Sequence, residues 1–153
     1  MKNYTSTVDP ETTIYRIENI LARFGVSNVS KDYTNGDVSG IVFTLLMPDS
    51  PPMQVRLPAN VDLVYEHLKK IGKRPTRTPI DVWQRRMKDQ SRRTAWKLIQ
   101  DWIEVQLSLV EMKQAEAAQV FLPYFWDGKK TFYAAIKERK FVGIVNKQEQ
   151  PAQ

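Results

Sequence analysis

The chain has 153 residues, of which 42% are apolar, so we expect one domain (residues 1–153) with a hydrophobic core. It has no cysteine, a single histidine and no run near 20 apolar residues, which excludes disulfides, multi-histidine metal sites and a transmembrane helix. Its formal net charge is +6. Because the N-terminal residues include no apolar leader, we expect a cytoplasmic protein. We also expect no metal and no cofactor.

Residues 1–71 predict a helix, three strands and a second helix. The first helix begins at Asp9-Pro10 and ends at Gly25, with apolar residues at three- and four-residue spacing between them. Asn35-Gly36 predicts a two-residue hairpin turn between an alternating strand and the buried strand 41–47. A loop at 49–52, required by two prolines, leads to a third strand at 53–57. The second helix follows at 61–71.

The next segment, residues 72–80, predicts a basic arm stiffened by Pro75 and Pro79. The longest helix then begins near Ile80 and extends to about residue 118. Because such a helix exceeds the size of the domain, we expect either a break near 89–93 or projection of its basic half. Its apolar stripe comprises Trp83, Met87, Ala95, Leu98, Trp102, Val105, Leu109 and Met112, with Ile99, Ile103 and Val110 in a second stripe.

The remaining helical half, up to residue 145, contains an aromatic patch at 121–126. These rings either cap the core or form a partner interface, for which Phe125 and Trp126 are the candidates. A last helix capped by Thr131 is expected to turn its apolar residues inward, and 146–153 is a polar tail. The inward residues are Phe132, Tyr133, Ile136 and Phe141. The predicted fold class is α+β: a three-stranded antiparallel β-meander packed by helices, followed by a long basic helix and a C-terminal helical cap.

Positive charge is concentrated between Lys69 and Lys97. This stretch holds eleven of the 23 Lys and Arg residues and two acids, so its net charge is +9 while the rest of the chain sums to −3. Clustered like charge destabilises a fold, which indicates an anionic partner, with nucleic acid as the first candidate. An acidic protein surface and plain solvation are the alternatives. The candidate nucleic-acid-binding residues are Lys73, Arg74, Arg77, Arg85, Arg86, Arg92, Arg93, Trp96 and Lys97.

Trp96 has two interpretations. On a helical wheel it lies among Arg92, Arg93 and Lys97, where an exposed ring would stack on an unpaired base. The same ring also adjoins Ile99 on the second apolar stripe, which favours a place in the core.

Catalytic patterns are weak. Asp101, Glu104 and Glu111 share one side of the long helix, but this spacing is also typical of a solvated face. No Gly-rich phosphate loop and no nucleophile elbow is present. We therefore expect a protein that is not an enzyme.

The segments 95–107 (AWKLIQDWIEVQL) and 120–124 (VFLPY) resemble a group of small uncharacterised proteins carried by phages and other mobile elements. The N-terminal half, including VRLPANV at 55–61, resembles the same group. The resemblance implies no particular activity, but it implies a genetic setting of DNA metabolism and of countering host defence. The order helix, three strands, helix is also similar to the core of phage single-strand-annealing proteins.

The function expected from the sequence is non-enzymatic nucleic-acid binding by a phage or mobile-element protein, through phosphate contacts from the basic arm and helix. DNA and RNA, single or double stranded, remain open at this point. The alternative is a protein-binding inhibitor of a host defence system, of the anti-CRISPR or another anti-defence type. A third interpretation is a structural subunit that forms homo-oligomers through the aromatic patch.

Overall fold

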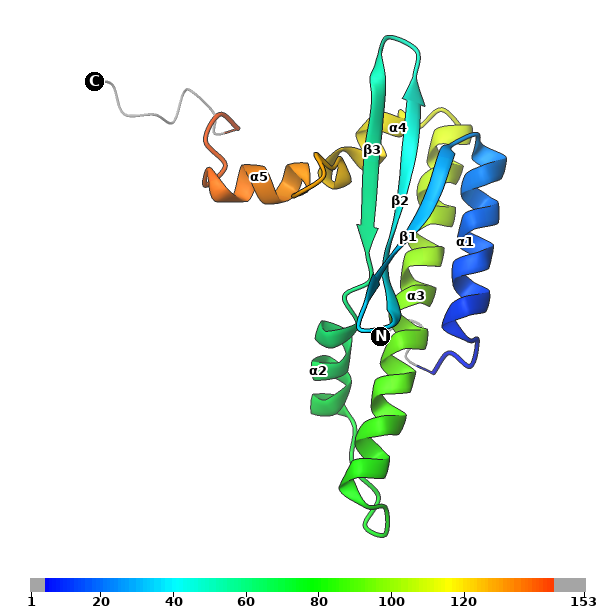
Figure 1. The fold of residues 1–153 in the computed structure, drawn as a ribbon, viewed down its shortest axis with the longest axis vertical. Coiled ribbons are helices and arrows are strands. Elements are labelled where there is room, and N and C mark those ends of the chain that lie inside the picture. Colours follow the sequence, from blue (N-terminus) through cyan, green and yellow to red (C-terminus); the bar gives the residue numbers. More distant parts are fainter. Residues whose placement is uncertain (1–4, 145–153) are drawn as a thin grey trace, which may run out of the picture.

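The computed structural model describes residues 5–144 and confirms an α+β fold (Figure 1). The polar tail predicted at 146–153 lies outside the described residues. No helix within 5–144 combines the length and apolar character needed to cross a bilayer. The elements in chain order are α1 (Pro10–Phe24), β1 (Ser27–Thr34), β2 (Asp37–Met47), β3 (Ser50–Pro58), α2 (Val61–Ile71), α3 (Ile80–Glu111), α4 (Ala117–Phe121), the 3-10 helix η1 (Leu122–Tyr124) and α5 (Phe132–Glu138).

The three strands form an antiparallel sheet in the order β1-β2-β3. Asn35 and Gly36 have φ angles of 53° and 84°, as a primed hairpin turn between β1 and β2 requires. The loop predicted at 49–52 is shorter than expected, because Pro51 and Pro52 belong to β3. Prolines are tolerated there because they stand near the start of an edge strand, beside an irregularity in its pairing with β2.

The hydrophobic core lies between the sheet and two helices, α1 and α3. Alternate residues of β2 point to the same face, and their side chains cluster with buried residues of both helices. In Figure 1, α1 and α3 run side by side along the strands. The fully buried members of this cluster are Ile17, Leu21, Ile41, Phe43, Val55, Ile103 and Phe121, each 0% exposed.

Helix α3 is unbroken over its 32 residues, which corresponds to a length of about 48 Å. Of the two outcomes expected for it, the structure shows projection: the N-terminal half extends past the sheet, with α2 beside it (Figure 1). The predicted apolar stripe is wrong in its second half, where Val105 and Met112 are 57% and 73% exposed. The core is contacted instead by the face that carries Trp96, Ile103 and Leu107.

Part of the aromatic patch caps the core. Phe121 contacts Phe43 edge to face, with 5.3 Å between ring centroids, and Tyr124 contacts Trp102 in the same manner at 5.4 Å. Phe125 forms a bridge with Val55 of β3, which fixes the end of the patch to the edge of the sheet.

The last helix does not cap the core, contrary to the sequence prediction. Helix α5 extends away from β3 (Figure 1) and packs only on η1 among the elements with substantial contacts. Phe132, Tyr133 and Phe141 are 42%, 52% and 42% exposed, so these three expected inward residues face solvent in the described structure. The turn after Trp126 directs the chain outward before α5 begins.

That turn depends on Asp127, whose carboxylate accepts backbone N–H groups from Lys129 and Lys130 at 2.8 and 2.9 Å. These two bonds favour the charged form, so the pKa of Asp127 lies below its usual value of 3.8. A lowered folded-state pKa contributes stability above the unfolded value that is lost as the pH falls through the folded value. We therefore expect the turn to loosen only below about pH 3.8. A carboxyl NMR titration checks this, and a midpoint at or above 3.8 would contradict it.

Candidate nucleic-acid interface

The projecting end of the molecule consists of α2, the arm at 72–79 and the first turns of α3. Leu68 anchors α2 and is 3% exposed. Lys88 of α3 forms an ion pair with Asp62 of α2, and its ammonium lies 5.1 Å from the centre of the Tyr65 ring. These contacts fix α2 against α3, so the arm between them is held at both ends.

Gly72 allows the end of α2 to approach α3 closely. A Cβ atom at this position would lie 2.9 Å from Met87 Cε and 3.9 Å from the Trp83 ring. After Gly72 the chain turns through the arm, where Thr78 N–H donates to the Pro75 carbonyl at 3.0 Å. The two prolines limit the conformations of this basic segment before it meets a partner.

Acidic side chains neutralise part of the basic stretch. Arg92 pairs with Asp37 at the start of β2 at 2.7 Å, and Lys97 pairs with Asp101 on the next turn of α3 at 3.5 Å. Both cations are less than one third exposed. Arg92 and Lys97, two of the candidate nucleic-acid-binding residues, therefore already have counter-charges within the protein.

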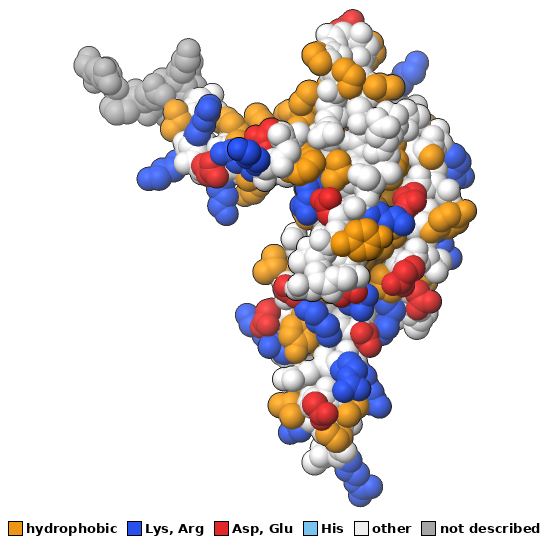
Figure 2. Space-filling model, viewed as in Figure 1, with side chains coloured by type: hydrophobic (Ala, Val, Ile, Leu, Met, Phe, Trp, Pro, Cys, Tyr) orange, Lys and Arg blue, Asp and Glu red, His pale blue; other side chains and the backbone are white. Residues whose placement is uncertain are grey.

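Most cations of the projecting end have no acidic partner within residues 5–144. Six of them are exposed, and none of the six forms an ion pair with an acid of residues 5–144. Figure 2 shows Lys and Arg side chains gathered over this lower end of the molecule. We call this group the basic tip: Lys70, Lys73, Arg74, Arg77, Arg85 and Arg86.

Arg93 is intermediate between these two groups. Its guanidinium donates to the Ser6 carbonyl at 3.1 Å and to the Gln90 side-chain carbonyl at 2.7 Å. Both acceptors are neutral, so the positive charge of Arg93 is not compensated by a carboxylate within the described residues. Arg93 both holds the N-terminal segment against α3 and retains its charge.

Trp96 belongs to the core. Its side chain is 2% exposed and packs in the cluster between the sheet, α1 and α3. Of its two interpretations, base stacking therefore fails and the core interpretation holds. The physical reason is that its turn of α3 lies over the sheet, whereas the projecting turns begin earlier in the helix.

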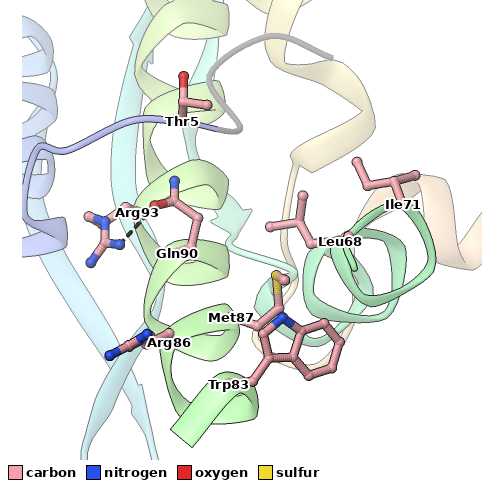
Figure 3. Close-up of a pocket in the computed structure, with 9 residues that line it drawn as sticks. Thr5, Leu68, Ile71, Trp83, Arg86, Met87, Gln90 and Arg93 are labelled. Carbon is pink, nitrogen blue, oxygen red and sulfur yellow. Dashed lines mark hydrogen bonds between the residues drawn. The ribbon is translucent and has the colours of Figure 1, made fainter. Parts of the chain in front are cut away.

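A groove between α2 and α3 was not predicted from the sequence. It has a volume of about 800 Å³, and Leu68, Ile71, Trp83 and Met87 form its apolar part. In Figure 3, Trp83 and Met87 lie on the α2 side of α3, while Arg86 and Arg93 extend from the other side. The signal in the sequence is the i, i+4 pair of Trp83 and Met87, which belongs to the predicted apolar stripe.

No protein-family model, no curated protein and no solved structure matches this chain. The resemblance to small phage and mobile-element proteins therefore stays a prediction. In the part of the chain that the structure describes, no group of three or more His, Asp or Glu side chains is placed to share a metal ion. The function is thus inferred from the basic tip and the groove beside it.

Proposed function

We propose that this protein is a non-enzymatic nucleic-acid-binding protein of a phage or mobile element, and that the basic tip is its phosphate-binding surface. One observation carries the proposal: six exposed cations without carboxylate partners within residues 5–144 lie together at one projecting end, while Arg92 and Lys97 nearer the sheet are paired with acids. Unneutralised like charge repels itself, and an anionic partner removes that repulsion.

The shape of this end suits a polyanion. The arm and the first turns of α3 present cations on a convex projection, so they can approach a phosphate backbone without steric hindrance from the sheet (Figures 1 and 2). Lys and Arg side chains that contact phosphates position a nucleic acid without reading its sequence. We therefore propose binding without strong sequence preference.

The test is fluorescence anisotropy with labelled single- and double-stranded DNA and RNA across a salt series. Phosphate contacts release counterions, so the logarithm of the affinity is expected to fall linearly with the logarithm of salt concentration. Four to six contacts would give a slope of roughly −3 to −5. Absence of binding to all four probes at low salt would refute the proposal.

A second candidate is a protein-binding function, such as inhibition of a host defence system, with α5 as the docking element. The observation in its favour is apolar surface on and after this projecting helix, where Val142 and Ile144 are 73% and 64% exposed in addition to the three rings. Phe125 and Trp126, the interface predicted from sequence, are half-buried at the edge of β3 instead. Aromatic residues are enriched in protein interfaces.

If α5 joins copies of this chain, Phe132→Ser with Tyr133→Ser is expected to lower the mass measured by light scattering from that of an oligomer to that of a monomer. The change removes exposed apolar area and leaves the core intact. Leu63→Ser is a matched control, since Leu63 is 70% exposed on α2. Wild-type protein that is monomeric at every concentration would contradict self-association, and a pull-down would then test for a different partner.

A further inference from the structure

The α2–α3 groove combines three features that belong to different residues. Its floor is apolar, its wall includes the partly buried ring of Trp83, and Arg86 and Arg93 line its rim and extend from the side of α3 away from α2 (Figure 3). The groove is continuous with the basic tip, because Arg86 belongs to both. We propose that this groove binds unpaired bases of single-stranded nucleic acid, with Trp83 as the stacking platform.

The packing of α2 against α3 leaves part of the Trp83 ring open to a ligand. Leu68 fills the space beneath α2, and Gly72 lets α2 end beside Trp83 and Met87 without a side chain of its own between them. The indole ring is thus supported at one edge by Met87 and α2 but is not enclosed, unlike Trp96. A planar, supported and accessible ring is the arrangement on which an unpaired base stacks.

Arg86 and Arg93 are expected to position the backbone of a bound nucleic-acid strand beside the groove. Arg86 and Arg93 are seven residues apart on α3, so their Cα atoms are separated by about 10 Å along the helix axis. Neither is paired with a carboxylate of residues 5–144. A backbone that follows the guanidinium side of α3 places its phosphates near these two groups, and its bases then extend across the helix toward Trp83.

Charge and ring together favour one occupant. A purely apolar peptide would leave Arg86 and Arg93 without counter-charge, and a duplex keeps its base faces stacked inside the helix, out of reach of an indole plane. A single strand supplies both the anionic backbone and exposed base faces. A volume of about 800 Å³ lies within the range of small-ligand pockets, so the groove has room for a nucleotide unit.

This inference rests on the proposed function, and the experiment separates the two. Wild type, Trp83→Ala, Trp83→Phe and Arg85→Ala with Arg86→Ala are titrated with a labelled 20-mer of thymidylate and with a blunt DNA duplex. Trp83→Ala is expected to weaken binding of the 20-mer roughly 5- to 150-fold, with little change for the duplex. Trp83→Phe retains a stacking ring and is expected to keep most of the affinity. Leu63→Ala, an exposed apolar change outside the groove, is the control.

A second measurement does not depend on a truncated side chain. Addition of the unlabelled 20-mer is expected to quench tryptophan fluorescence in the wild type, and this quenching is expected to disappear in Trp83→Phe although three other Trp residues remain. Unchanged 20-mer affinity in Trp83→Ala, together with loss in the arginine variant, would overturn the base-binding groove and leave the proposed function standing. Equal losses for the 20-mer and the duplex would also overturn it. If the wild type binds neither probe, both proposals fall.

Discussion

Replacing Arg85 and Arg86 together by alanine is expected to weaken nucleic-acid binding by roughly 10- to 100-fold at moderate salt. Both side chains are exposed at the basic tip and have no carboxylate partner within residues 5–144, so their charge is available to phosphates. The slope of log affinity against log salt is expected to become shallower by about 2, one unit for each lost phosphate contact. Anisotropy titrations across a salt series measure both quantities.

A matched control comes from the same helix. Arg92→Ala with Lys97→Ala removes the same number of positive charges, but these two cations are paired with Asp37 and Asp101. The control is expected to change affinity by no more than about threefold, because both cations already have acidic partners within the protein. Equal losses in both double variants would show that net charge alone matters, and the basic tip would lose its assigned role.

Trp96→Ala is expected to destabilise the folded protein by about 3–5 kcal/mol. The side chain is 2% exposed and lies in the cluster between the sheet, α1 and α3, so its removal leaves a cavity that the rigid sheet cannot fill. Domains of this size are stabilised by only about 5–15 kcal/mol in total, so much of the stability would be lost. Urea denaturation followed by circular dichroism measures the change.

Trp83→Ala provides the comparison, because this Trp is on the same helix but is only partly buried, outside the core cluster. Its expected cost is about 1 kcal/mol, the usual size for a single substitution outside the core. The core interpretation of Trp96, which the sequence favoured, thus holds, whereas Trp83 of the predicted apolar stripe lines the groove instead of the core. A Trp96→Ala protein as stable as the wild type, but deficient in nucleic-acid binding, would reverse this assignment.

Local signals predicted the elements well. Asp9-Pro10 and Gly25 bound α1, Asn35-Gly36 forms the first hairpin turn, and α2 has the predicted bounds 61–71. Each of these caps and turns depends on the backbone preferences of a few neighbouring residues, so residue types alone predict it. The order of three antiparallel strands follows from such short connections.

The faces of α3 were harder to predict because one helix meets two different neighbours. Its first turns contact α2, whereas the later ones contact α1 and pack with the sheet in the core cluster, so the buried side rotates along the helix and no single stripe describes it. Charge partners are likewise distant in sequence: Arg92 and Asp37 are 55 positions apart. The direction of α5 depends on the edge of β3, which no local pattern in 132–138 reveals.

The continuity of α3 has a mechanical consequence. Since its 32 residues form one continuous helix, α3 acts as a spacer between whatever is held at its free end and the sheet. Inserting one residue midway would rotate that end by about 100° and advance it by about 1.5 Å, whereas inserting seven would nearly restore its orientation at a greater distance. Variants of this kind would separate the effect of reach from the effect of angle in any assembly that this protein joins.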